Sequence, residues 1–254
     1  MIDFHTHIIP NIDDGSRSEE ETNSLLLEAC NAGFDKIIST SHYYVSRYEA
    51  NVAERKKSLK SISENFNMRN NKNMEFFLGN EIFIVPNIIE LILECKASTI
   101  NMTRYTLIEL PLRNEVYNVK EILYSLMEKK CKPVIAHPER YKVVQENPNY
   151  LIDLIEMGVL FQSNYASIIG YYGSEAKKTV KKLLQANMIH FLGSDAHREG
   201  TIYPEIPKIL KELEKIVGEK RLKELTTLNA EKILKDEDLE AYQPSEIKKG
   251  LFSF

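Results

Sequence analysis

The chain has 254 residues, of which 43% are hydrophobic, and it carries a net charge of −4 with a pI near 6.0. This length and composition are typical of a globular protein, and we expect one domain over residues 1–254. The acidic balance provides no basic field for nucleic acid or anionic lipid. Three scattered cysteines, without a signal peptide or a membrane-spanning apolar run, predict a cytoplasmic protein with free thiols.

The predicted elements alternate between short apolar strands and longer amphipathic helices. The first strand covers residues 1–7. The helix after it begins at Ser18, which forms a capping-box pattern with Glu21, and ends near Gly33, a residue type favoured at helix C-caps. The later strands are expected at 35–42, 74–82, 104–110, 132–137, 159–164 and 188–197. The helical segments between and after them are expected at about 49–66, after Pro86, and at 118–130, 148–157, 174–187 and 204–234.

This order of elements predicts the fold class. Seven strand–helix units with nearly continuous apolar strands indicate a parallel sheet that is buried on both faces. Seven or eight such units over about 250 residues are typical of a closed α/β barrel of the TIM type. An open doubly wound sheet is the alternative, but no G-x-G-x-x-G follows the first strand.

Ionisable side chains stand at the carboxyl ends of the predicted strands. Every unit except the sixth ends in an acid or a histidine, and five of the six histidines lie at such an exit. Because the carboxyl end is the catalytic face of α/β barrels, these side chains are expected to converge. The sixth histidine, His190, starts its strand and is expected to be structural, at the opposite rim. The expected set is His5, His7, Asp14, His42, Glu81, Glu109, His137, Asp195 and His197.

The composition of this set predicts a metal centre. Taken singly, each residue could be a loop or capping residue, but four crowded carboxylates raise one another's pKa, and divalent cations remove that conflict. Imidazoles and carboxylates without a thiolate favour Mn, Fe, Zn or Mg. Nine ligands are too many for one ion, so we expect two or three ions with a bridging carboxylate.

The opening stretch contributes several of these ligands. Side chains alternate along a strand, so His5 and His7 share a face and can reach one ion. In the DDG turn that follows, Gly15 allows a tight backbone and one aspartate points back to the site. Asp13 and Asp14 are both candidates for that role, and the other would cap the turn.

Such a centre suits the hydrolysis of phosphate esters. Clustered divalent ions generate hydroxide near neutral pH and stabilise both oxygens of an in-line displacement. Arg140, three residues after His137, is expected to bind the phosphate through its planar guanidinium; the alternative is a surface arginine beside Glu139. A cysteine-dependent phosphatase is disfavoured, because no arginine lies within eight residues downstream of any cysteine.

Several motifs together resemble a known superfamily. In order, they are DFHTHIIPNIDDG, STSHY, GNEI, LIEL, VIAHPERY and GSDAH. They resemble the polymerase-and-histidinol-phosphatase (PHP) superfamily and, more closely, the manganese-dependent bacterial protein tyrosine phosphatases of capsule and exopolysaccharide synthesis. The resemblance runs to about residue 235. It implies a distorted barrel of seven strand–helix units, a trinuclear site, and phosphotyrosine on the tail of a bacterial tyrosine autokinase as substrate.

The resemblance also implies a role for each site residue. It favours Asp14 over Asp13 as the ligand and assigns the substrate phosphate to Arg140. A hydroxide bridging two ions would attack phosphorus, and His42 or a metal-bound water could act as general acid. The implied ligand groups are His5, His7, Glu81 and Asp195 for the first ion, Glu81, Glu109 and His137 for the second, and Asp14, His42 and His197 for the third.

Two features of the sequence leave alternatives open. The resemblance implies a second phosphate-binding arginine a few residues after the D-x-H motif, but the only arginine nearby is Arg198, directly after His197. Either Arg198 replaces it from a shifted position or that contact is missing. The residues after His42 could wall a phosphotyrosine ring or form a plain aromatic loop; they include Tyr43, Tyr44, Arg47 and Tyr48.

Three other functions compete with a tyrosine phosphatase. A histidinol-phosphate or other small-metabolite phosphatase would use the same ions and differ in the rim of the pocket. A phosphodiesterase or exonuclease is disfavoured by the acidic charge balance. A non-catalytic scaffold is disfavoured because the ligand set is intact.

Overall fold

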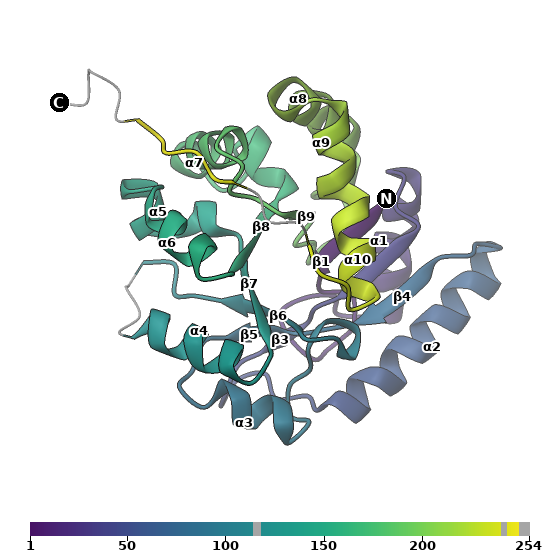
Figure 1. Cartoon of the computed structure of the whole chain (residues 1–254). Helices are drawn as coiled ribbons and strands as arrows, with labels where there is room; N and C mark the ends of the chain where they lie inside the picture. Colours follow the sequence, from purple (N-terminus) through teal and green to yellow (C-terminus); the bar gives the residue numbers. More distant parts are fainter. Residues whose placement is uncertain (114–117, 240–242, 249–254) are drawn as a thin grey trace.

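The computed structural model describes residues 1–113, 118–239 and 243–248 and shows strands surrounded by helices (Figure 1). The paired strands run parallel, as predicted. The strands predicted at 35–42 and 74–82 are each divided in two. In chain order the strands are β1 Ile2–Thr6, β2 Lys36–Ser39, β3 His42–Tyr43, β4 Glu75–Leu78, β5 Glu81–Phe83, β6 Tyr105–Glu109, β7 Lys132–Ala136, β8 Leu160–Asn164 and β9 Phe191–Gly193.

The strands follow one another around a distorted barrel. Two sheets are present, in the orders β1-β2-β4 and β3-β5-β6-β7-β8-β9. The chain passes from the first sheet to the second between β2 and β3 and again between β4 and β5. Beyond the end of β9, Thr6 forms a parallel bridge with Ala196, and the His7 amide donates to the Ala196 carbonyl at 3.1 Å. These links connect the last unit to the first and confirm the predicted α/β class, with the sheet divided into two curved parts.

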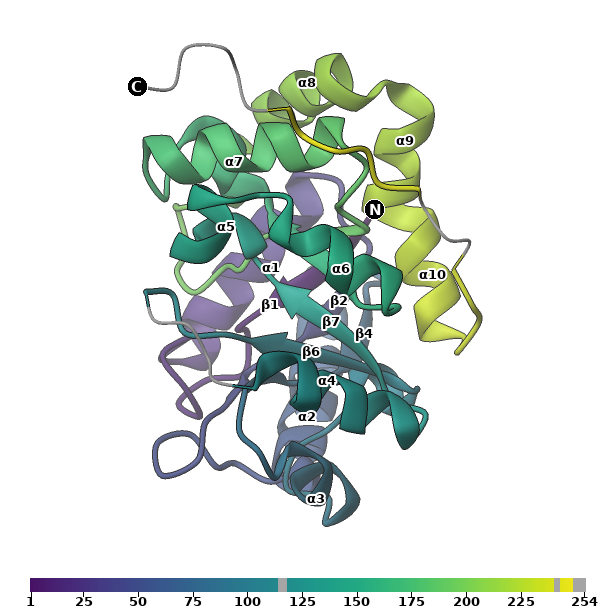
Figure 2. The ribbon, with the colours of Figure 1, turned by 60° about the vertical axis from the view of Figure 1, so that its left-hand side comes forward.

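The helices lie outside the strands, as two views related by rotation agree (Figure 2). The predicted segment 204–234 is divided into several helices, and the helix predicted at 148–157 is preceded by an additional short one. The helices are α1 Glu19–Asn31, α2 Val52–Asn70, α3 Ile88–Leu93, α4 Val119–Glu128, α5 Lys142–Glu146, α6 Tyr150–Glu156, α7 Ser174–Gln185, α8 Ile206–Val217, α9 Glu219–Lys223 and α10 Asn229–Leu234. Single-turn 3₁₀ or π segments cover η1 Ile100–Met102, η2 Pro138–Arg140, η3 Tyr165–Ile169, η4 Tyr203–Glu205 and η5 Glu224–Leu228.

The start of α1 agrees with the predicted capping pattern in part. The Ser18 hydroxyl accepts a hydrogen bond from the Glu21 amide at 3.1 Å, as an N-cap does. The Glu21 carboxylate accepts from the Arg17 amide at 2.7 Å, so the reciprocal bond is displaced by one residue. Gly33 follows the C-cap residue with φ 94°, a conformation that favours glycine.

The apolar core has two parts, one between the helices and the strands and one inside the barrel at its amino-terminal end. One large cluster packs the helices against the strands. A smaller cluster joins side chains from β1, β2, β6, β7, β9 and α10, including Phe4 and Phe191, whose rings stack 4.2 Å apart. Side chains from strands on different sides of the ring meet only in its interior. The polar site is therefore confined to the carboxyl end. No helix in the described part of the chain is both long enough and apolar enough to span a membrane.

A buried arginine on α2 explains the break between β4 and β5. Arg55 is fully buried, and its guanidinium donates to the Gly79 carbonyl at 2.5 Å, the Ser98 hydroxyl at 2.9 Å and the Ala50 carbonyl at 3.2 Å. Asn80 adds a bond to the Ser41 carbonyl at 2.6 Å. Side chains therefore hold the backbone where the ladder is interrupted, directly before Glu81.

We expect Arg55→Met to lower the free energy of unfolding by about 3 kcal/mol, because it leaves the Gly79 carbonyl and the Ser98 hydroxyl buried without their donor. Urea denaturation followed by circular dichroism measures this change. Lys56→Met, one residue away on the exposed face of α2, is the matched control and should change stability by less than about 0.5 kcal/mol. Equal denaturation midpoints for the two variants would show that the break does not depend on Arg55.

Candidate metal centre

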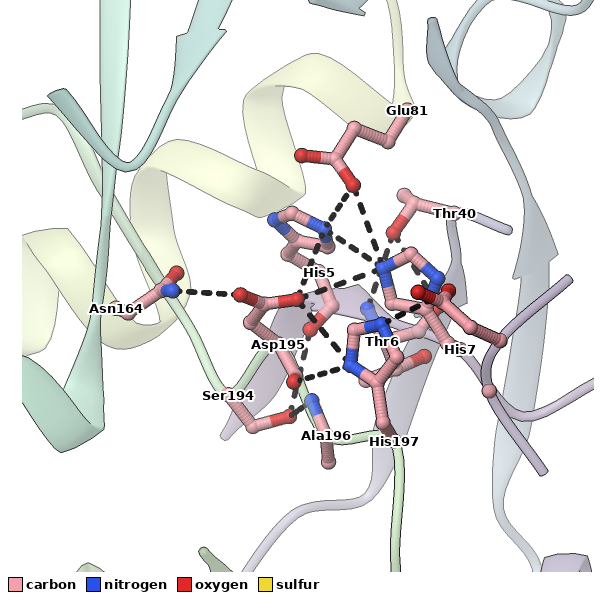
Figure 3. A network of polar contacts seen from close by, with 12 residues as sticks. His5, Thr6, His7, Thr40, Glu81, Asn164, Ser194, Asp195, Ala196 and His197 are labelled. Carbon is pink, nitrogen blue, oxygen red and sulfur yellow. Dashed lines mark hydrogen bonds and ion pairs between the residues drawn. The ribbon is translucent and has the colours of Figure 1, made fainter. Parts of the chain in front are cut away.

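The predicted site residues converge at the carboxyl ends of the strands. Figure 3 shows five of them, His5, His7, Glu81, Asp195 and His197, side by side. His5 lies on β1, while His42 and Glu81 begin β3 and β5. His137 follows β7, and Asp195 follows β9. Residues from both ends of the chain thus share one small volume, as the strand-exit pattern predicts.

Glu81 is the hub of this arrangement. Its Oε2 lies 3.2 Å from Nε2 of His5, 3.4 Å from Nε2 of His7 and 3.1 Å from Nδ1 of His42. Its Oε1 lies 2.8 Å from Nε2 of His137. One carboxylate therefore faces four imidazoles through its two oxygens, so it could hold a metal ion on each side.

The ligand atoms form overlapping groups, each within 4.8 Å, and the first contains the same residues as the group predicted for the first ion. The other two groups differ from the predicted ones. The second contains His42 in place of His137, and the third contains His7 as an additional member. His137 remains close to the second group, with Nε2 3.7 Å from Glu109 Oε1. The three groups are His5, His7, Glu81 and Asp195; His42, Glu81 and Glu109; and His7, Asp14, His42 and His197.

The donor atoms fit divalent cations. Glu81 Oε2 is buried and has no hydrogen-bond partner. The Nε2 atoms of His5 and His7 lie 3.0 Å apart and point to the same position. A buried polar atom without a partner is costly, and a cation that accepts lone pairs from all three atoms removes that cost. The nitrogen and oxygen donors suit Mn, Fe or Zn.

The electrostatics of the cluster lead to the same requirement. Burial, and then the charges of Glu81 and Asp195, raise the pKa of Glu109 to about 9. Burial also acts to raise the pKa of Glu81, but the His5 and His42 imidazoles hold it well below its usual range. Burial opposes protonation of His7, yet Asp13 raises its pKa well above the usual value. The carboxylates thus need positive charge beside them, from protons or from divalent ions.

Residues behind the cluster orient its imidazoles, and sequence reasoning did not predict most of them. The Asp13 carboxylate lies 2.9 Å from His7 Nδ1 and accepts from the amides of Gly15 at 2.9 Å and His42 at 2.8 Å. Asp13 therefore caps the turn and also fixes the His7 ring. Asp14 instead faces the cluster, with Oδ1 3.5 Å from His42 Nε2.

β8, the strand predicted at 159–164, has no acid or histidine at its end and contributes amides instead. Gln162 Oε1 lies 2.8 Å from His5 Nδ1. Asn164 Nδ2 donates to Asp195 Oδ2 at 2.7 Å. Partners of this kind set the orientation of metal ligands. The sequence signal was two amide side chains on alternate residues at the carboxyl end of the strand.

Close backbone packing and strained residues also shape the site. A Cβ on Gly15 would lie 2.5 Å from the His7 Cβ, and one on Gly193 would lie 2.5 Å from the His5 Cβ. Gly15 is therefore needed for the close approach of His7. His137 and Asp195 have positive φ values of 33° and 54°. Such conformations cluster at functional sites, because the surroundings must hold them.

Arg140 lies at the edge of the cluster, beside Asp195. Its Nη1 donates to Asp195 Oδ2 at 3.0 Å, and its guanidinium lies 4.4 Å from the ring centroid of Tyr172. With His197, these residues line a cavity of about 200 Å³. The neighbouring Glu139 is buried and accepts from Ser167 Oγ at 2.6 Å, so it is not a surface partner of Arg140.

The structure also places the residues whose roles were left open. Arg198 lines the same cavity, but its guanidinium bonds the carbonyls of Gly15 and His197 and thereby ties the DDG turn to the end of β9. Among the aromatic residues after His42, Tyr48 stacks on the His42 ring with centroids 5.9 Å apart. Tyr43 is instead buried in the core.

His190 lies at the opposite end of the barrel, as predicted. It is buried, its Nδ1 accepts from the Phe161 amide at 3.1 Å, and burial lowers its pKa to about 3. It lines a pocket together with Tyr105, Lys132 and Leu160, the first residues of β6, β7 and β8. A neutral imidazole held this way supports the barrel and takes no part in the cluster.

The fold and the site define a class of protein: α/β barrels that gather histidines and carboxylates at the carboxyl ends of their strands. More particularly, the chain belongs to the CpsB/CapC family of capsular polysaccharide synthesis, whose model matches residues 1–235. It is 34% identical over 197 residues to the putative tyrosine-protein phosphatase CapC of Staphylococcus aureus, covering 78% of this chain and 77% of that protein. It is 31% identical to the tyrosine-protein phosphatase YwqE of Bacillus subtilis, covering 100% of both chains.

Solved structures agree with this assignment. One match, with a TM-score of 0.91, comes from the crystal structures of YwqE from Bacillus subtilis and CpsB from Streptococcus pneumoniae. Those two proteins are described as unique metal-dependent tyrosine phosphatases. The matched chain is 30% identical, and the match covers 98% of this chain and 100% of that chain. A histidinol phosphate phosphatase of Lactococcus lactis has a TM-score of 0.54 at 15% identity, covering 85% of this chain and 92% of that one, and shares the fold.

Proposed function

We propose that this protein is a metal-dependent tyrosine phosphatase, a phosphoric monoester hydrolase that needs no cysteine. The observation that carries the proposal is the Glu81 hub, whose buried Oε2 faces three imidazoles within 3.4 Å without a hydrogen-bond partner. Family membership and the activity named for its relatives support it. The nine predicted ligands would hold two or three ions, with manganese as the proposed metal.

The chain's own residues would position the phosphate for attack. Bound divalent ions activate water as a nucleophile and neutralise charge on a phosphoryl group. Arg140, oriented by Asp195 and Tyr172, would hold the phosphate oxygens through its planar fork. Burial lowers the pKa of His42, which favours a ligand role over a general-acid role. A phenolate leaving group, with a pKa of about 10, needs less protonation than an alkoxide.

The biological setting is a further part of the proposal. We infer that the substrate is phosphotyrosine on a bacterial tyrosine autokinase, because the family is one of capsular polysaccharide synthesis. We also infer a single domain over residues 1–254 and a cytoplasmic location. The free cysteines support the location, since disulfides are rare in the cytoplasm.

Removal and return of metal tests the proposed function. Chelator-stripped protein should lose its activity on a phosphotyrosine peptide, and Mn²⁺ should restore most of it. Zn²⁺, Mg²⁺ and Fe²⁺ are compared in parallel, and phosphoserine peptides and histidinol phosphate serve as competing substrates. A stripped protein that remains active, or a preference for histidinol phosphate, would contradict the proposal.

A further inference from the structure

A cleft lined by cationic side chains adjoins the candidate active site. It has a volume of about 740 Å³, and its lining among the described residues contains three cations and no acid, although the whole chain carries a net charge of −4. We call it the cationic cleft. Its lining residues are Leu112, Arg113, Arg140, Lys142, Gln145 and Tyr172.

The cationic cleft and the cavity beside the metal cluster share a wall. Arg140 and Tyr172 line both of them. The guanidinium of Arg140 is oriented by Asp195, whose other oxygen belongs to the first ligand group. A peptide whose phosphate reaches Arg140 can therefore extend into the cationic cleft.

The cations beyond Arg140 are not neutralised by strong pairs. Lys142 pairs with Glu146 at 3.6 Å, but both side chains are about two-thirds exposed, and such pairs contribute little. Within the described ranges, no carboxylate forms an ion pair with Arg113. The backbone beneath them is ordered, because the Lys142 amide donates to the Leu112 carbonyl at 3.0 Å. Arg113, which follows β6 in the chain, and Lys142, the first residue of α5, thus both place positive charge at the cleft.

We propose that the cationic cleft binds an anionic side chain of the substrate, close in sequence to the phosphotyrosine. The ligand is a carboxylate or a second phosphate on the same peptide, since both offer oxygens to Arg113 and Lys142. The cleft would thus give the enzyme a preference for acidic or multiply phosphorylated segments. This inference rests on the proposed phosphatase function.

The test compares phosphotyrosine peptides that differ only in one neighbouring position. That position carries alanine, glutamate or a non-hydrolysable phosphonate analogue of phosphotyrosine, and it is moved along both sides of the substrate residue. At the best position, we expect kcat/KM for the glutamate peptide to exceed that of the alanine peptide about fivefold, mainly through KM. The phosphonate peptide shows whether a phosphate is preferred to a carboxylate. The preference should decrease in 0.5 M salt.

Variants test whether the preference for glutamate comes from the cationic cleft or from the overall charge of the protein. The double variant R113Q/K142Q should reduce the glutamate preference to about one, whereas Arg113→Lys should retain most of it. The matched control K56Q/K60Q removes two exposed charges from α2 and should keep the wild-type preference. An equal rate on alanine and glutamate peptides, or a preference unchanged in R113Q/K142Q, overturns the inference while the phosphatase function stands. If no phosphotyrosine peptide is hydrolysed, both fail.

Discussion

A Glu81→Gln protein should lose about a thousandfold of its phosphatase kcat/KM, equivalent to about 4 kcal/mol of transition-state stabilisation. The substitution keeps the shape of the side chain. It removes the charge that faces the imidazoles of His5, His7 and His42 and places an amide where a bridging oxygen is needed. Steady-state rates on a phosphotyrosine peptide and metal content by elemental analysis measure the two effects together.

The control for this prediction is Glu75→Gln, a half-exposed carboxylate on β4. That variant should keep wild-type activity and metal content. Circular dichroism should show that both variants are folded, so that lost activity reflects the centre and not the barrel. Full metal content and normal rates in the Glu81→Gln protein would show that Glu81 is not a ligand.

Arg140→Lys should lower kcat/KM about a hundredfold while leaving the metal content unchanged. Lysine keeps the positive charge but lacks the planar fork that can donate to Asp195 and to a phosphate at once, and it stacks less well on Tyr172. Inorganic phosphate should inhibit the variant more weakly by a similar factor. Kinetics with phosphate as a competitive inhibitor, alongside elemental analysis, make this measurement.

Arg104→Lys offers the comparison at the opposite end of the barrel, where Arg104 pairs with Asp236 and Asp238. Its rates and phosphate inhibition should match the wild type. If Arg140→Lys bound phosphate as tightly as the wild type, Arg140 would not be the phosphate ligand. If it lost metal instead, Arg140 would act by holding Asp195 in place.

The fold class could be predicted because it depends on a repeated local signal. Apolar strands alternate with amphipathic helices, and only a few architectures bury such a pattern. The breaks in the strands predicted at 35–42 and 74–82 could not be predicted. They depend on bonds of Arg55 with Gly79 and Ser98 and of Asn80 with Ser41 and Ser98, which join residues 18 to 43 positions apart in sequence.

The location of the candidate site was also accessible from the sequence, because the carboxyl ends of parallel strands share one face. The H-x-H spacing of His5 and His7 and the acids and histidines at later strand ends named most of the set, and the family resemblance was needed to favour Asp14 over Asp13. The partners of those ligands were not accessible. Gln162 and Asn164 are ordinary strand residues until the barrel brings their amides beside His5 and Asp195.

The sequence by itself therefore determined which residue types stand at each strand end, since side-chain alternation and strand order follow from local pattern. Only the tertiary structure decided how they share the site. It made Glu81 the hub, assigned Asp13 to support His7, and turned Arg198 toward the backbone of Gly15. Distances of about 3 Å between residues far apart in the chain depend on the curvature of the barrel and the packing behind it, and no local pattern encodes these.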